Sequence, residues 1–436
     1  MDRLPNELLL SIGEYLDRPT RRALTGCCRQ FHQLFEPLLY STFTFSIRKP
    51  SHSIALGRHL WRRPDLARHC RHAKFNFICC CHSHSYANIL DHALIEQMVN
   101  RICETHSEKA HWKEHLHSSC HDAWSAVLLT CLSHLRSLVF NGCDAVNFIP
   151  RILDKAALRQ RPFHENVPFS FLQEVGLPSS LLIHYNFSAA LFHFPAVRKI
   201  VAEGISDVAI ENKRARRSAL VGIRNPVCSI TEIVVLSVRI PYSMSNWIAA
   251  CNRLECFKVC TDMGLFGFDA NTFRQCLLPS KDTLKSVTVV SFTFIDFRPG
   301  QPRNPIPGGI PFGSFKEFHT LERLTIPHSR LTRVHINGGN EPRQSLQDML
   351  PSSLRFLGVI EDVGVSFVDL VPDLHTLVNV GTDLMPNLER IELMSLQKPE
   401  ESVQRLVDAL AMACETKGIC LIYRPSLARM RDIFFA

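Results

Sequence analysis

A six-residue pattern of apolar positions recurs through most of the chain. Its first, fourth and sixth residues are apolar, and most copies follow a helix-like stretch and a short polar or proline turn. Because 46% of all residues are hydrophobic, a single match carries little weight, and the shared context is what indicates a repeat. The copies begin at Leu135, Leu172, Val197, Ile230, Leu254, Leu284, Leu321, Leu354 and Leu388.

The repeats predict an α/β fold. Each hexad reads as a strand, and the segment before it reads as a helix, so stacked repeats would form a parallel strand ladder backed by helices. The hexads start 24 to 37 residues apart. This is longer and less regular than the period of about 20–29 residues in standard leucine-rich repeats. We therefore predict an irregular leucine-rich-repeat-like solenoid over residues 131–425, with GICLIY (418–423) as the last strand and a tail at 426–436.

Residues 4–45 follow a different pattern, that of three short amphipathic helices and a strand. Pro5 suits the first helical position and Glu7 the first turn, where a carboxylate complements the helix dipole. Leu8, Ile12 and Leu16 recur every four residues, and a cap at residue 17 can start the next helix. So small a module cannot bury all its apolar residues by itself, which predicts that one face packs against a neighbour or a partner.

These residues also carry a family resemblance. The run LPNELLLSIGEYL followed by LTGCCRQFHQL resembles the F-box, in which Leu-Pro, an acid and an apolar-every-four helix precede Val-Cys-Arg and an aromatic. Cys27 stands where valine is usual, while Cys28, Arg29 and Phe31 fit. The strand STFTFSI and the later DLARHCRHAKFNF resemble fungal F-box proteins. The alternative is a plain helical cap on the repeats.

The resemblance implies a division of the chain and a function. Residues 1–48 would be the F-box, and residues 49–130 a connecting helical or first-repeat segment rich in histidine and cysteine. The F-box would dock a Skp-family adaptor and, through it, a cullin, while the repeats hold a protein target for ubiquitination and proteasomal degradation. The chain itself would be non-catalytic. The implied adaptor-binding residues are Leu4, Pro5, Glu7, Leu8, Ile12, Leu16, Leu24, Cys28 and Phe31. A ligase-independent binding scaffold is the alternative.

The target surface is predicted from the strand pattern. In each hexad the third and fifth residues point away from the core, onto the concave strand face. The later repeats place charge and an aromatic together there, a mixture that anchors protein interfaces. The candidates are Lys258, Arg323, Phe356, Arg390 and Glu392. The alternative holds the target at the Pro- and Gly-rich loop 297–315.

Histidines and cysteines between residues 69 and 121 raise the question of zinc. They include His69, Cys70 and His72, the run CCCHSH (79–84), and His111 with His115, one helical turn apart. However, the sequence contains no pair of Cys-x-x-Cys motifs and no His-Glu-x-x-His motif, so we expect no bound zinc and no other cofactor. It also contains no Gly-x-Ser-x-Gly, phosphate loop or dinucleotide fingerprint. A metal-dependent enzyme is the remaining catalytic alternative.

Charge and hydropathy restrict the partners and the compartment. The net charge of +8 is spread over 436 residues, which is too diffuse for a nucleic-acid interface. No apolar run reaches the roughly 18 residues of a membrane span. Seventeen cysteines without a secretory signal favour reduced thiols in the cytoplasm and/or nucleus. The basic run NKRARRS (212–218) is either a nuclear import signal or a solvated segment.

Overall fold

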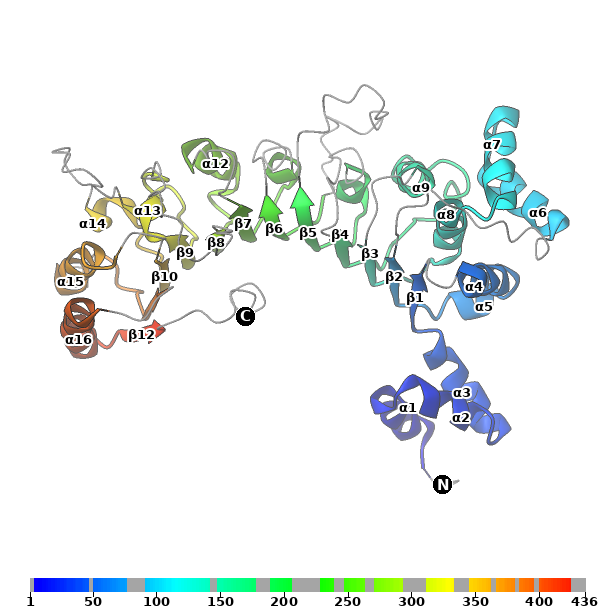
Figure 1. Ribbon diagram of the computed structural model, residues 1–436, viewed down its shortest axis with the longest axis horizontal. Coiled ribbons are helices and arrows are strands. Elements are labelled where there is room, and N and C mark those ends of the chain that lie inside the picture. The colour runs from blue at the N-terminus through cyan, green and yellow to red at the C-terminus, as the bar shows by residue number, and fades with distance from the viewer. Residues whose placement is uncertain are drawn as a thin grey trace, which may run out of the picture. The chain divides into compact units, whose positions relative to one another are not determined.

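The structure is a computed structural model of the chain (Figure 1). It describes residues 4–46, 50–76, 91–141, 147–177, 189–205, 228–238, 247–262, 270–292, 311–332, 345–361, 366–380, 384–395 and 400–424. The chain forms two compact units, the first made of residues 1–200 with 213–229 and the second of residues 201–212 with 230–436.

Twelve parallel strands make up the ladder of the described residues, and their order in the sheet is their order in the chain. They are β1 (Thr42–Ser46), β2 (His72–Asn76), β3 (Ser137–Asn141), β4 (Glu174–Leu177), β5 (Lys199–Ile205), β6 (Glu232–Val238), β7 (Cys256–Asp262), β8 (Ser286–Phe292), β9 (Arg323–Pro327), β10 (Phe356–Ile360), β11 (Arg390–Met394) and β12 (Cys420–Arg424). Each of β3 to β11 begins at the third residue of a predicted hexad. The predicted fold class, an α/β ladder backed by helices, is therefore confirmed.

Helices precede or connect these strands. In the first unit they are α1 (Asn6–Tyr15), α2 (Arg18–Thr25), α3 (Arg29–Leu39), α4 (Pro50–Arg62), α5 (Pro64–Ala67), α6 (His92–Ile102), α7 (His106–His117), α8 (His121–Cys131), α9 (Phe148–Ala157) and the 3₁₀ turn η2 (Ala189–His193). In the second unit they are α12 (Ala270–Leu277), η4 (Leu278–Ser280), α13 (His328–Leu331), α14 (Leu346–Met349), α15 (Leu370–Val380) and α16 (Glu401–Thr416).

The first unit contains the three-helix module α1–α3 and the start of the ladder. Strands β1, β2, β3 and β4 pair in parallel, and the ladder thus includes two strands that precede residue 131. A buried phenylalanine stands at the same register position in the three successive strands β1, β2 and β3. The Phe75 ring lies 5.6 Å from Phe45 and 5.8 Å from Phe140, centroid to centroid. This aromatic row fills the space between strands and helices.

Buried Asp122 links two helices of the first unit. Its carboxylate, at the start of α8, accepts hydrogen bonds from the backbone N–H groups of Asn147 (2.5 Å), Phe148 (2.8 Å) and Ile149 (3.2 Å). These are donors at the N-terminus of α9 that no helical carbonyl can satisfy. A side chain distant in sequence therefore caps this helix.

The second unit repeats one rung geometry from β6 to β12. The strands pair in parallel with third residues opposite each other, as with Arg323, Phe356 and Arg390. Leu357 and Ile391, at the fourth position of their hexads, are fully buried on the side that carries the helices. Figure 1 shows α12, α15 and α16 along that side of the strands. The core thus lies between the ladder and the helices.

A repeated backbone contact fixes where each strand begins. The carbonyl oxygen of Glu322 accepts hydrogen bonds from the N–H groups of Arg355 (2.8 Å) and Phe356 (2.9 Å). The carbonyl oxygen of Arg355 accepts the same pair of bonds from Glu389 (2.9 Å) and Arg390 (3.1 Å) in the next repeat. Because the starts of β2 to β5 and of β7 to β11 share such a carbonyl, equivalent side chains stand in rows across the strands.

Candidate functional site: two interaction surfaces

Local capping shapes the N-terminal module. The Asp17 carboxylate accepts a hydrogen bond from the backbone N–H of Thr20 at 2.9 Å, which caps α2 as the sequence predicted. Hydrogen bonds from Thr20 hold the pKa of Asp17 below its usual value. The sulfur of Cys28 accepts from the N–H of Phe31 at 3.4 Å and caps α3. Cys28, named among the adaptor-binding residues, therefore also has a local structural role.

The helices α1 and α3 cross closely at a glycine. A Cβ placed on Gly13 would lie 2.6 Å from Cε1 of Phe35, so the crossing needs a residue without a side chain. Leu9 and Phe35 are 4% and 2% exposed and form the centre of the module. The guanidinium of Arg21 donates from Nε to the Gly13 carbonyl at 2.8 Å. One face of α1 is thus fixed against α3.

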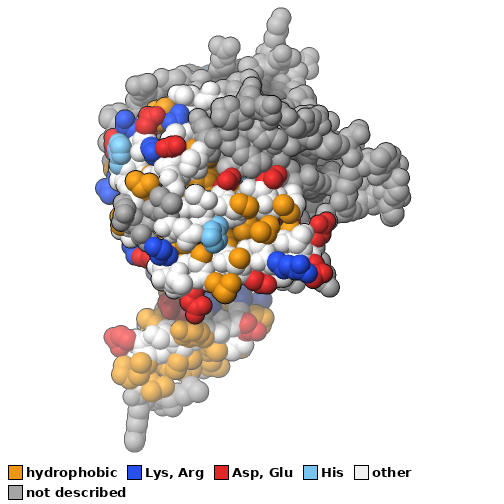
Figure 2. Space-filling view, turned by 90° about the vertical axis from the view of Figure 1, so that its left-hand side faces the viewer, with side chains coloured by type: hydrophobic (Ala, Val, Ile, Leu, Met, Phe, Trp, Pro, Cys, Tyr) orange, Lys and Arg blue, Asp and Glu red, His pale blue; other side chains and the backbone are white. Residues whose placement is uncertain are grey.

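The opposite face of α1 is apolar and open in the described structure. Leu4, Leu8 and Ile12 are 41%, 52% and 48% exposed, and Tyr15 is 92% exposed. Figure 2 shows hydrophobic side chains gathered on this module, at the bottom of the view. Isolated exposed apolar residues are ordinary, but a continuous face of this kind marks an interaction site. We call Leu8, Ile12 and Tyr15, together with Leu4 just before the helix, the apolar face of α1.

The other predicted adaptor-binding residues are distributed around this module. Pro5, Glu7 and Cys28 are exposed, whereas Leu16, Leu24 and Phe31 are half-buried. Tyr15 was not in the predicted set. Its spacing of three residues from Ile12 and seven from Leu8 places it on the same helical face, and that spacing could have identified it.

A second candidate surface lies in the third-position row of the second unit. The guanidinium carbon of Arg323 (β9) lies 4.6 Å from the ring centroid of Phe356 (β10), and that of Arg390 (β11) lies 5.5 Å from the same centroid. The three residues are direct register partners on neighbouring strands. We call Arg323, Phe356 and Arg390 the Arg-Phe-Arg row.

A glycine lets the ring lie along its own strand. A Cβ on Gly358, two residues after Phe356, would lie 3.1 Å from Cε1 of the Phe356 ring and 2.9 Å from Oγ1 of Thr325. Both distances are shorter than ordinary carbon contacts at van der Waals separation. Gly358 therefore provides the space that the ring and its neighbours occupy on this face.

Glu392 holds Arg390, the last residue of the row, by an ion pair. Its side chain is 8% exposed and accepts from Arg390 at 3.0 Å and from Arg424 at 2.5 Å. Glu392 was predicted to contact the target, but its carboxylate is buried and shared between two arginines. Lys258, the fifth predicted residue, is half-buried on β7 and stands outside the row.

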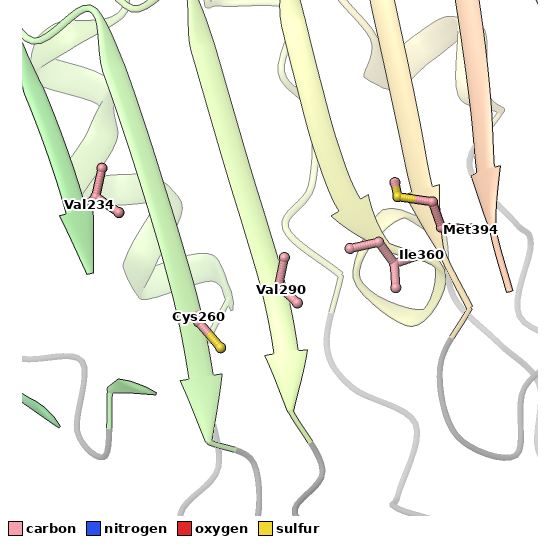
Figure 3. Packing of buried hydrophobic residues seen from close by; sticks show 5 residues of the cluster. All are labelled: Val234, Cys260, Val290, Ile360 and Met394. Carbon is pink, nitrogen blue, oxygen red and sulfur yellow. The ribbon is translucent and has the colours of Figure 1, made fainter. Parts of the chain in front are cut away.

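Burial changes along each strand on the face that carries the row. Third positions such as Arg323 are exposed or half-buried, whereas the fifth positions Thr288 and Thr325 are 6% and 7% exposed. The same face carries a buried apolar cluster at the fifth position of β6 and the seventh position of β7, β8, β10 and β11. Figure 3 shows its side chains: Val234, Cys260, Val290, Ile360 and Met394. On β8 to β11 the accessible part of this face is therefore the start of the strands, whereas Lys258 on β7 is half-buried at the fifth position.

The histidine- and cysteine-rich segment is partly described. His111 and His115 on α7 have ring centroids 4.6 Å apart, and both rings contact Phe148. Burial raises the pKa of Cys70 to about 12 and so disfavours the thiolate that binds metals. Within the described residues, no group of three or more His, Cys, Asp or Glu side chains is placed to hold a metal ion. The run at 79–84 lies outside the described residues.

Two other predicted features fall wholly or partly outside the description. The basic run 212–218 lies outside the described residues, and of the loop 297–315 only residues 311–315 lie within them. Among the helices in the described part of the chain, none is long and apolar enough to span a membrane.

Comparison with known proteins agrees with this arrangement. The family described as a leucine-rich repeat domain matches residues 167–427, more than half of the chain, and the family described as F-box-like matches residues 1–46. No curated protein matches the chain. The first match covers the ladder from just before β4 to the end of β12, and the second covers α1–α3 and β1. The chain therefore belongs to the leucine-rich repeat domain family, with an F-box-like domain at residues 1–46.

Proposed function

We propose that this protein is the substrate-recognition subunit of a Skp/cullin/F-box-type ubiquitin ligase. The F-box-like domain docks a Skp-family adaptor and through it a cullin. The ladder holds a protein target, and other subunits of the complex catalyse ubiquitin transfer. Both domains are interaction modules, so the chain acts by bringing proteins together.

The apolar face of α1 carries this proposal. Leu8 and Ile12 leave about half of their side-chain surface in water although Leu9 and Gly13, their immediate neighbours, are buried. Burying a large apolar side chain fully contributes roughly 1.5–3 kcal/mol, so leaving several exposed on one short helix favours a partner that covers them. An adaptor with a hydrophobic groove satisfies this requirement.

The ladder adds the second half of the function by placing a bound target within reach of the ligase. Holding two proteins in one assembly converts their encounter into a quasi-intramolecular step with a high effective concentration. We propose that Arg323, Phe356 and Arg390 contact the target, together with Lys258 on β7. Glu392 holds the Arg390 guanidinium in place through their ion pair.

Co-purification of the adaptor tests the docking half. The full-length protein and a Skp-family adaptor are co-expressed, and Leu8→Asp combined with Ile12→Asp is compared with wild type. Truncating a buried interface anchor costs about 2 kcal/mol or more, roughly thirtyfold in affinity, and a buried charge costs more. We expect the double variant to lose the adaptor while its far-ultraviolet circular dichroism is unchanged.

A matched control is Met412→Asp, which places the same charge on a 65% exposed apolar residue of α16. This control should retain the adaptor. Undiminished adaptor capture by the double variant would contradict the docking role. Recovery of adaptor without any cullin would contradict the ligase role and favour a ligase-independent scaffold.

Loss of the target tests the second half. Charge reversal of Arg323 and Arg390 should abolish target capture in cells treated with a proteasome inhibitor while the adaptor is retained. If capture survives both changes but is lost when residues 297–310 are deleted, the loop rather than the ladder holds the target.

A further inference from the structure

We infer that the Arg-Phe-Arg row binds a side-chain carboxylate in an acidic segment of the target protein. The inference rests on the proposed function for the row's role as a target surface. It adds the chemical class of the segment and assigns Arg323 as the residue that contacts it.

Arg323 lies over the ring of Phe356. A guanidinium that lies over an aromatic ring uses its flat face for the contact, while its N–H groups remain in the plane and free to donate. The 4.6 Å separation between Arg323 and the Phe356 ring is within the range of such a contact. Phe356 therefore positions Arg323, and among the described residues no acceptor takes the guanidinium donors that a two-pronged bond to a carboxylate would use.

The charged side chains around Arg323 are paired with one another. Glu389 is paired with Arg355, and Glu392 is shared by Arg390 and Arg424. The hydrogen bond and the charge of Glu389 raise the pKa of the Arg355 guanidinium, and the charge of Glu322 adds a smaller contribution. Among the described residues, Arg323 has no carboxylate within 4.0 Å of its guanidinium nitrogens. Arg323 is thus the exposed arginine of this group whose N–H donors remain available for hydrogen bonds.

The charged side chains on and beside the Arg-Phe-Arg row carry a small net positive charge. Four guanidiniums (Arg323, Arg355, Arg390 and Arg424) stand against three carboxylates (Glu322, Glu389 and Glu392), which leaves a single net positive charge. A net charge of +1 is balanced by one bound carboxylate. A nucleic acid would need a row of unpaired cations along its phosphates, so the acidic protein segment is the better match.

The exposure of the residues around the row indicates from which side the acidic segment approaches it. The fifth positions Thr325 and Glu392 are 7% and 6% exposed, and Gly358 between them is buried. Arg323 is exposed, and Arg390 retains 39% of its side-chain surface. The acidic side chain thus reaches the row at the start of strands β9 to β11. The segment that carries it lies across these strands rather than along them.

The test uses random short peptides displayed on phage and selected on the purified full-length protein bound to its adaptor. We expect selected peptides to be enriched in Asp or Glu at one common position. Synthetic copies are then titrated by fluorescence anisotropy. Because a hydrogen bond to a charged group contributes about 1.5–3 kcal/mol, Arg323→Gln should weaken binding about tenfold or more. Replacing the common acid by Asn or Gln should have the same effect.

Two further variants distinguish a direct contact at Arg323 from a general effect of charge and from misfolding. Arg405→Glu on α16, where the side chain is 77% exposed, should leave peptide affinity unchanged. Arg323→Glu should reject the acidic peptide but accept a copy whose common acid is changed to Arg, a recovery that an unfolded variant could not show. Affinity for the acidic peptide should also fall as salt rises.

The inference is overturned if selection yields no enriched peptide, peptides without a common acid, or peptides that bind Arg323→Gln as tightly as wild type. Binding of a labelled single-stranded oligonucleotide that depends on Arg323 and competes with the peptides would also overturn it. None of these results touches adaptor capture, so they leave the ligase role standing. Conversely, loss of adaptor docking together with intact peptide binding would contradict the ligase role and leave the carboxylate-binding role of the row standing.

Discussion

Arg323 and Phe356 stand opposite each other on adjacent parallel strands, with the guanidinium carbon 4.6 Å from the ring centroid. Arg390 lies on the other side of the same ring, on β11. Cation–π contacts of this kind contribute about 0.5–1 kcal/mol at exposed sites. Their effect here is chiefly geometric, because one ring fixes two long side chains that would otherwise sample many rotamers.

Replacing Gly358 should disturb this arrangement. Gly358→Val places a branched side chain where a Cβ alone would lie 3.1 Å from the Phe356 ring and 2.9 Å from Thr325. Overpacking of this kind costs about 1–3 kcal/mol. We expect urea unfolding to show a loss of stability in this range. Gly26→Ala, where a Cβ meets only a carbonyl oxygen at 3.4 Å, should change stability little.

Tyr15 should contribute to adaptor docking. Its side chain is 92% exposed and lies on the same helical face as Leu8 and Ile12. Aromatic residues are enriched among the anchors of protein interfaces, so Tyr15→Asp should weaken adaptor binding about tenfold or more. Isothermal titration with purified adaptor would measure this. Phe171→Asp, a change at a 49% exposed aromatic elsewhere in the first unit, should leave the affinity unchanged.

Removing the carboxylate of Asp122 should destabilise the first unit. Asp122→Ala leaves the N–H groups of Asn147, Phe148 and Ile149 without their acceptor. Phe148 and Ile149 are buried, whereas Asn147 is exposed and its N–H can bind water. Each buried unsatisfied group costs about 1–3 kcal/mol, so the total loss should reach about 2 kcal/mol or more. Urea unfolding compared with the exposed-site control Asp282→Ala provides the measurement. A loss below about 1 kcal/mol would contradict the capping role.

Acid should destabilise the first unit through His121. Burial lowers the pKa of this histidine from 6.5 to about 4, and its ring packs 4.8 Å from Phe45. Between those two pKa values the unfolded chain binds a proton that the folded chain does not, so stability falls as pH falls. Each pH unit over this interval corresponds to about 1.4 kcal/mol, or about 2 kcal/mol between pH 6.5 and 5.

The variant His121→Gln isolates this contribution. It should show a smaller loss of unfolding free energy than wild type when the pH is lowered from 6.5 to 5, whatever its stability at neutral pH. His164→Gln, a change at an exposed histidine, should keep the wild-type pH dependence. Equal slopes for His121→Gln and wild type would show that His121 is not the titrating group.

Several features of this protein were determined by local sequence. The apolar first, fourth and sixth residues of each hexad located strands β3 to β11 and their register, because alternation along a strand is a property of neighbouring residues. The same holds for the helices of the N-terminal module and for the cap at Asp17, which reaches only three residues ahead. The residues that carry the F-box resemblance are likewise contiguous.

Other features required the tertiary structure. Alternation places third, fifth and seventh positions on one face, but only packing decided that Arg323 is accessible while Glu392 and Met394 are buried. The Arg-Phe-Arg row joins residues 33 and 34 positions apart, and it forms because the rungs share one register. On α1, Leu9 turned inward because Gly13 allows Phe35 to approach, leaving the apolar face outward. Side-chain exposure depends on non-local neighbours, and a periodic pattern does not encode them.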